Sequence, residues 1–183
     1  FTYYLSDEAT DKFIDFDLSN SSMNKGETLE DTLGAFEMMG VDLCILRHTE
    51  SIIHDFVKNF SNMQFINAGE GSFSHPTQTL IDLMTIRESK EKFDNLNIAI
   101  VGDLDHSRVV SSFIEGIQIV GYKSITFCGH PDLCKNFIDS PIGNFESELE
   151  TALQDADIVM ALRIQNERLS EKLSIEAKDY IDR

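Results

Sequence analysis

The chain has 183 residues, of which 42% are hydrophobic and 26% are charged, and its formal net charge is −17 at pH 7. This length and composition exclude a disordered tail and predict one or two compact units with a buried core. The acidic charge argues against nucleic acid or an anionic membrane as a partner, because both would be repelled.

The cysteine content and the hydropathy favour a protein of the reducing cytoplasm. Cys44, Cys128 and Cys134 form no CxxC pair and fit a reducing cytoplasm, where we expect them as small core residues. No apolar run approaches the roughly 18 residues of a membrane span, and no signal peptide is recognisable. We therefore expect a cytoplasmic protein outside the membrane. The chain begins without a methionine and stops inside a helix-forming stretch, so we also expect sequence beyond both ends.

Short apolar runs alternate with stretches of helical spacing along the chain. The runs predict buried strands at 13–16, 41–46, 63–66, 97–101, 124–128 and 157–162. The helical stretches lie at 28–39, 51–60, 76–88, 108–120 and 147–156. This alternation predicts an α/β protein with two lobes, each a mostly parallel sheet flanked by helices. Two βαβ groups separate near the charged connection at 89–97, which either joins two lobes or simply links a helix to a strand.

Arginines follow several of the predicted strands. The chain has six arginines, and four of them fall at or near strand ends: Arg47, Arg108, Arg163 and Arg168. Ligands of open α/β sheets bind at the carboxyl ends of the strands, and guanidinium groups suit carboxylates and phosphates. Together the four predict a pocket for a small anionic ligand, although each one alone is equally well explained by a neighbouring surface acid.

His75 directly precedes a proline at the start of a predicted helix. Pro76 is well placed at the first helical position and keeps His75 out of the helical conformation. The imidazole can then face a carbonyl oxygen or an anion beside the first-turn N–H groups. Gln78 adds an amide that both donates and accepts hydrogen bonds. The alternative, in which His75 only caps the helix, has equal support from spacing alone.

Residues 19–32 hold a polar loop with Lys25-Gly26 that leads into a helix with acids in its first turns. Such a loop reaches a phosphate in some proteins, but a solvated loop is the simpler interpretation of a lone lysine.

Five motifs resemble the catalytic chain of aspartate carbamoyltransferases in order and spacing, over nearly the whole sequence. They are "SSMNKGETLEDT" at 21–32, "LRH" at 46–48, "INAGEGSFSHPTQTLIDLMTI" at 66–86, "IAIVGDLDHSRVVSS" at 98–112 and "ALRIQNER" at 161–168. "HPTQ" alone would indicate only the wider transcarbamylase family, whereas "KGET" and "RIQNER" favour the aspartate enzyme over the ornithine enzyme.

The resemblance implies transfer of a carbamoyl group from carbamoyl phosphate to L-aspartate in pyrimidine synthesis, without a cofactor. It implies that Arg47 and His75 act at the carbonyl oxygen of carbamoyl phosphate and that Gln78 binds its amide. It further implies that Arg108 binds the α-carboxylate of aspartate and that Arg163, with Gln165, binds the side-chain carboxylate.

The resemblance also implies an assembly. Ser21 as a substrate-binding residue and Lys25 as a catalytic one match a loop that a neighbouring subunit inserts, so a homotrimer with shared active sites is expected. Whether a regulatory chain also binds stays open. The expected domains are 1–92, part of a carbamoyl-phosphate-binding domain, and 93–183, part of an aspartate-binding domain.

The chain departs from the family pattern at several places. The family's main phosphate-binding segment is expected before Phe1 and a Pro-Leu-Pro loop after Arg183. Asp105 stands where a lysine is common, and Glu70 stands where an aspartate is usual. No role is expected for Val109, where relatives often have threonine.

Three alternatives remain beside the aspartate enzyme. One is an inactive paralogue with a structural or assembly role, and another is a transcarbamylase for a different amine. A nucleotide-binding α/β protein is weaker, because "VGDLDHSR" lacks the G-x-G-x-x-G spacing. No metal site is expected: Cys128, His130 and Cys134 are close in sequence but are interpreted as core cysteines and a loop histidine.

Overall fold

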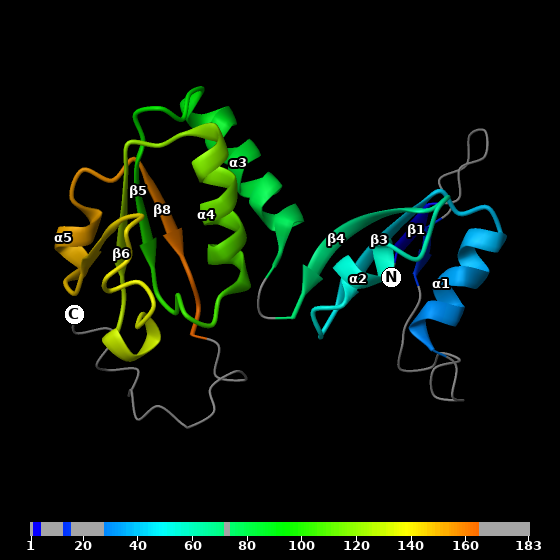
Figure 1. Cartoon of the computed structure of the whole chain (residues 1–183). Helices are drawn as coiled ribbons and strands as arrows, with labels where there is room; N and C mark the ends of the chain where they lie inside the picture. The colour runs from blue at the N-terminus through cyan, green and yellow to red at the C-terminus, as the bar shows by residue number, and fades with distance from the viewer. Residues whose placement is uncertain (1, 5–12, 16–27, 72–73, 165–183) are drawn as a thin grey trace. The chain divides into compact units, whose positions relative to one another are not determined.

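The computed structural model describes residues 2–4, 13–15, 28–71 and 74–164, shown in colour in Figure 1. The chain divides into two compact units, Phe1–Thr77 and Gln78–Arg183, and each has its own sheet. No helix in the described ranges is long and apolar enough to cross a membrane.

The first unit holds a four-stranded sheet in the order β2-β1-β3-β4. Its strands are β1 (Thr2–Tyr4), β2 (Phe13–Asp15), β3 (Leu43–His48) and β4 (Gln64–Glu70), and its helices are α1 (Leu29–Met38) and α2 (Ile53–Val57). Strands β3 and β4 are parallel and joined through α2, whereas β1 is antiparallel to both β2 and β3. The carboxyl ends of β3 and β4 therefore lie at one edge of this sheet.

Helix α1 begins at a capping box. The backbone N–H of Asp31 donates to Thr28 Oγ1 at 3.1 Å, and the Thr28 N–H donates back to the Asp31 carboxylate at 3.1 Å. Hydrogen bonds from the Thr28 side chain and backbone lower the pKa of Asp31. Gly40, with φ +84°, follows the end of the helix. The buried side of α1, with Leu29 and Leu33, packs on Cys44 and Leu46 of β3.

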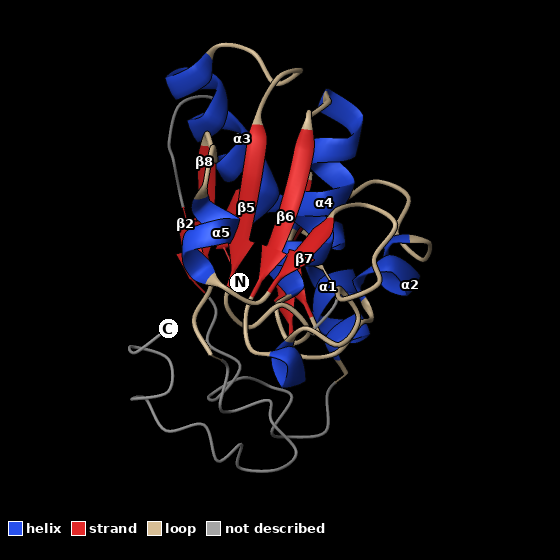
Figure 2. Cartoon of the chain, turned by 90° about the vertical axis from the view of Figure 1, so that its left-hand side faces the viewer, coloured by secondary structure: helices blue, strands red, loops and turns tan. Residues whose placement is uncertain are grey.

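The second unit is a four-stranded, all-parallel sheet in the order β7-β6-β5-β8. Its elements are α3 (Pro76–Lys90), β5 (Asn97–Val101), α4 (Arg108–Val120), β6 (Ser124–Cys128), the 3₁₀ turn η3 (Pro131–Leu133), β7 (Asn144–Glu146), α5 (Leu149–Leu153) and β8 (Ile158–Ala161). Helices α3 and α4 lie on one face of the sheet and α5 on the other, as Figures 1 and 2 show. This doubly covered parallel sheet confirms the α/β prediction.

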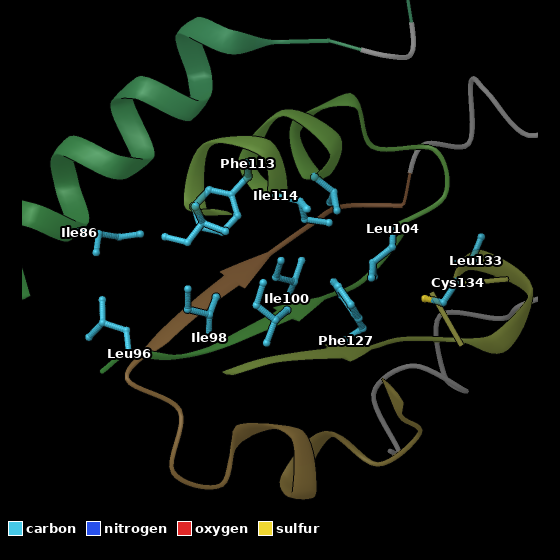
Figure 3. Close-up of a cluster of buried hydrophobic side chains, with 13 residues drawn as sticks. Ile86, Leu96, Ile98, Ile100, Leu104, Phe113, Ile114, Phe127, Leu133 and Cys134 are labelled. Carbon is cyan, nitrogen blue, oxygen red and sulfur yellow. The ribbon is translucent and has the colours of Figure 1, made fainter. Parts of the chain in front are cut away.

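The core of the second unit lies between α4 and the sheet. Figure 3 shows Phe113 of α4 directed toward Ile98 and Ile100 of β5, with Phe127 of β6 beside them. Helix α3 adds Ile86 to the same cluster. The continuous apolar run of β5 and the apolar stripe along α4 meet here, as expected for a parallel sheet covered by helices.

The predicted strands and helices are all present, and α4 has the predicted bounds. Strands β1 and β7 were not predicted. The compact units separate between Thr77 and Gln78 because Leu83 and Ile86 of α3 pack in the second core. The domain division at 92/93 stays a prediction about the functional domains.

Candidate functional site

Two of the predicted site residues belong to the carboxyl edge of the first sheet. Arg47 is the penultimate residue of β3 and is exposed. Its neighbour His48 pairs with Glu70, the last residue of β4, and accepts a hydrogen bond from the N–H of Gly71 at 3.1 Å. Arg47 therefore stands at the edge where β3 and β4 both end, which is where ligands of parallel sheets bind.

A β-bulge shapes this edge. Leu46 pairs with Asn67 and His48 with Glu70, so β4 has one more residue than β3 between these pairs. Gly69 has φ +118°, a conformation that residues with a side chain rarely adopt. Its N–H donates to Asn67 Oδ1 at 2.8 Å, so the Asn67 side chain supports the extra residue. Bulges of this kind are frequent beside active sites, where they redirect side chains.

His75 is connected to the same edge through Ser74. The N–H of Glu70 donates to the Ser74 carbonyl at 2.9 Å, and the N–H of Ser74 donates to the Glu70 carbonyl at 3.3 Å. His75 follows directly and is half-buried, with its Nδ1 3.3 Å from Thr77 Oγ1. Helix α3 begins at Pro76, as the His-Pro pair predicts. The structure thus brings Arg47 and His75 to one sheet edge.

Gln78 lies in the first turn of α3 and is half-buried. Its Nε2 donates to Asp82 Oδ1 at 3.0 Å, one turn further along the helix. This hydrogen bond orients the Gln78 amide. That Gln78 binds carbamoyl phosphate stays a prediction.

The carboxyl edge of the second sheet carries two further arginines of the predicted site, Arg108 and Arg163. Arg108 is the first residue of α4, which follows β5, and is half-buried; Arg163 lies two residues after β8 and is exposed. Strands β5 and β8 are parallel neighbours, and the N–H of Leu162 donates to the Val101 carbonyl at 2.7 Å. A side chain at Gly102, with φ +122°, would overlap the Leu162 carbonyl. The two segments after these strands therefore run side by side.

The β5–α4 connection is held by two acids. Asp103 is fully buried and accepts hydrogen bonds from Nδ1 of His106 at 2.7 Å and from the His106 N–H at 3.3 Å. The Asp105 carboxylate accepts from the N–H groups of Lys135 at 2.7 Å and Asn136 at 3.1 Å. Asp105 thus joins this connection to the segment after η3.

Some predictions fall outside the described residues, and some functional candidates were missed. Ser21, Lys25, Gln165 and Arg168 lie outside the described ranges. Glu70, Asp103 and His106 had no predicted role; for Asp103, an acid two residues after the buried strand β5 is a usable signal. Within the described ranges, no group of three or more His, Cys, Asp or Glu side chains could hold a metal ion.

Comparison with known proteins gives a consistent result. Residues 7–88 match the family described as aspartate/ornithine carbamoyltransferase, carbamoyl-P binding domain. The aspartate carbamoyltransferase catalytic subunit of Carboxydothermus hydrogenoformans is 41% identical over 155 residues, which are 85% of this chain and 49% of that protein. The chain spans about half the length of the curated relatives it matches.

Solved structures give the same family. Aspartate transcarbamoylase from Trypanosoma cruzi in complex with carbamoyl phosphate superposes with a TM-score of 0.74 and 27% identity, over 86% of this chain and 53% of that one. The same enzyme in complex with N-(phosphonacetyl)-L-aspartic acid gives a TM-score of 0.73 and 25% identity, over 87% and 56% of the two chains.

Proposed function

Because the chain belongs to the aspartate carbamoyltransferase family, we propose that the whole protein transfers the carbamoyl group of carbamoyl phosphate to the amino group of L-aspartate. The products are N-carbamoyl-L-aspartate and phosphate, and the reaction belongs to pyrimidine biosynthesis. The observation that carries this proposal is the edge formed by Arg47, the His48–Glu70 pair and His75, within the residues that match the carbamoyl-phosphate-binding family.

Arg47 and His75 stabilise the charge that develops at the carbonyl oxygen. The aspartate nitrogen forms a bond to the carbonyl carbon, and the C=O electron pair moves onto its oxygen. A guanidinium and an imidazole directed at that oxygen act as an oxyanion hole. The carbon–oxygen bond to phosphate then breaks, and the departing phosphate accepts the proton of the amine. The protein therefore contributes orientation and electrostatics rather than a covalent nucleophile.

Arg108 and Arg163 orient the acceptor. Arg108 binds the α-carboxylate of aspartate, and Arg163, with Gln165, binds the side-chain carboxylate. The closeness of the segments after β5 and β8 supports this division of roles, because both arginines follow neighbouring parallel strands. Gln78 binds the amide of carbamoyl phosphate. Planar guanidinium groups suit carboxylates because they donate two parallel hydrogen bonds.

The assembly and the domains are part of the same proposal. Ser21 and Lys25 enter the active site of a neighbouring subunit, so the protein works as a homotrimer in the cytoplasm, without a cofactor. Residues 1–92 contribute to the carbamoyl-phosphate-binding domain, and residues 93–183 to the aspartate-binding domain. The family match over 7–88 supports the first of these.

The test is formation of carbamoyl amino acids by the whole protein offered L-aspartate or L-ornithine. Arg163→Ala is expected to lower kcat/KM for aspartate by at least about 30-fold, the equivalent of about 2 kcal/mol for a lost charge pair. Arg87→Ala is the matched control, since Arg87 is an exposed arginine in the last turn of α3, and it should leave turnover unchanged.

Other outcomes identify the alternatives. Turnover with ornithine instead of aspartate would point to a transcarbamylase for another amine. A folded wild-type protein without turnover on either amine would favour an inactive paralogue with an assembly role.

A further inference from the structure

Glu70 is a buried acid whose two carboxylate oxygens both accept hydrogen bonds. Only 7% of the residue is exposed. Oε2 accepts from the N–H of Ile53, the first residue of α2, at 2.9 Å. Oε1 accepts from Nδ2 of Asn67 at 3.1 Å. A buried charge is tolerated only where hydrogen bonds replace its hydration, and here each oxygen has one such donor.

The backbone of the same residue connects two further segments. Glu70 pairs with His48 of β3 and exchanges two hydrogen bonds with Ser74, directly before His75. Glu70 therefore joins the end of β3, the start of α2, the bulge in β4 and the turn into α3. The Asn67 side chain that supports the bulge at Gly69 is itself held by Glu70 Oε1.

Arg47 and His75 each adjoin a partner of Glu70 in the sequence. Arg47 precedes His48, and His75 follows Ser74. The carboxylate contacts with Ile53 and Asn67 hold the Glu70 backbone in place. Loss of these contacts would therefore displace Arg47 and His75 relative to each other, through the backbone contacts of Glu70 with His48 and Ser74. Displacements of about 1 Å at a reacting centre cost on the order of 100-fold in rate.

We propose that Glu70 is a positioning residue for carbamoyl phosphate, whose carboxylate fixes Arg47 and His75 relative to each other across the carboxyl edge of the first sheet. This inference rests on the proposed function, because it concerns the same substrate. It assigns a task to a residue for which the sequence alone predicts none.

The experiment compares Glu70→Ala with Glu37→Ala in the whole protein. Glu37 is the matched control, because its Oε1 accepts from the N–H groups of Ser61 at 3.0 Å and Asn62 at 2.8 Å, directly before β4 and so at the opposite edge of the same sheet. Both variants lose two hydrogen bonds within the first unit, and both are expected to lower Tm.

Only Glu70→Ala is expected to change the binding of carbamoyl phosphate. Its dissociation constant for carbamoyl phosphate should rise about tenfold, and its kcat/KM for that substrate should fall about 10- to 100-fold. In Glu37→Ala both should stay within about twofold of wild type. Amide hydrogen exchange should accelerate at Ile53 in Glu70→Ala only.

A second variant covers the case in which Glu70→Ala does not fold. Glu70→Gln keeps the length of the side chain but has one acceptor oxygen, so it satisfies one of the two N–H donors. It should weaken carbamoyl phosphate binding by a smaller factor, about threefold to tenfold.

The results separate this inference from the proposed function. Wild-type turnover with aspartate, combined with wild-type binding in both Glu70 variants, would overturn the positioning role alone. If the wild type binds carbamoyl phosphate without turnover, the function fails, while weaker binding in Glu70→Ala still supports the positioning role. A wild type that does not bind carbamoyl phosphate would overturn both.

Discussion

The three cysteine side chains are buried in the two cores. Burial raises the pKa of the Cys44 thiol to about 11 and that of Cys134 to about 12. Burial, followed by the carboxylates of Glu148 and Glu146, also raises the pKa of Cys128. Because the thiolate is the reactive form, these thiols are protected by both their environment and their protonation.

The native protein is therefore expected to resist alkylation. At pH 8, iodoacetamide should modify Cys44, Cys128 and Cys134 slowly in the native protein and rapidly in denaturant, as peptide mapping by mass spectrometry would show. Because folding raises the pKa of Cys44, this thiol contributes to the free energy of unfolding. The contribution is fully present below a pH of about 8.5, the ordinary thiol pKa, and is lost as the pH rises toward about 11. Rapid alkylation of Cys134 in the folded protein at pH 8 would contradict this.

At the site, the sequence predicted which residues follow the strands but not the hydrogen bonds that fix their positions. Arg47 and His75 were predicted from strand ends and from the His-Pro pair, both of which are local signals. The task of Glu70 could not be predicted, because its donors Ile53 and Asn67 come together only when α2 packs beside β4. The contact of Asp105 with Lys135 and Asn136 spans about thirty residues and has no local signal.

Among the elements, α3 and α4 approach each other at a glycine. A Cβ at Gly116 would lie 2.5 Å from Thr79 Cγ2 and 3.2 Å from Leu83 Cδ1. Thr79 is buried, and its branched side chain has few alternative rotamers. The contact therefore depends on the absence of a side chain at position 116, although glycine costs about 1 kcal/mol relative to alanine inside a helix.

Gly116→Ala is expected to destabilise the protein despite the better helix propensity of alanine. Overpacking costs about 1–3 kcal/mol, which exceeds the propensity gain of about 1 kcal/mol over most of its range. Denaturant unfolding of the single variant and of Gly116→Ala with Thr79→Ser would measure this. The double variant should recover part of the loss, because serine lacks the Cγ2 methyl. If Gly116→Ala is more stable than the wild type, the close contact does not limit packing.

Apolar runs explain most of the predicted strands. Strands β3, β5 and β8 each carry four consecutive apolar residues, and α4 has a complete apolar stripe. Strand β2 was predicted despite its three residues, whereas the equally short β1 and β7 contain no aliphatic residue and were not predicted. Their place in the sheets depends on pairing with β3 and β6 rather than on their own pattern.

At the level of the whole molecule, the described hydrophobic side chains form two separate core clusters. One includes Leu33 and Leu46 in the first unit, and the other includes Phe113 and Phe127 in the second. The sequence predicted two lobes with a boundary near the charged connection after α3, and this division of the functional domains stays a prediction. Charge marks a solvated segment there, whereas the packing of Leu83 and Ile86 decides to which compact unit α3 belongs.

Substitutions in the two cores are expected to act locally. Leu46→Ala and Phe113→Ala should each cost about 3 kcal/mol, because both side chains are fully buried. Hydrogen exchange should accelerate mainly within 28–71 for the first variant and within 78–164 for the second. Leu80→Ala is the control, since Leu80 is 66% exposed and should change neither. Accelerated exchange across both units in either core variant would show that the cores unfold together.

The bulge in β4 also determines where this sequence tolerates a change in length. Side chains alternate between the two faces of a strand, so adding or removing one residue elsewhere in β4 would turn every later side chain to the opposite face. Between Asn67 and Glu70 the strand already holds one residue more than its partner. Loss of that residue would leave Glu70 opposite His48. We therefore expect one-residue gaps in alignments of related chains to fall at positions 68 and 69, and the rest of β4 to keep its length.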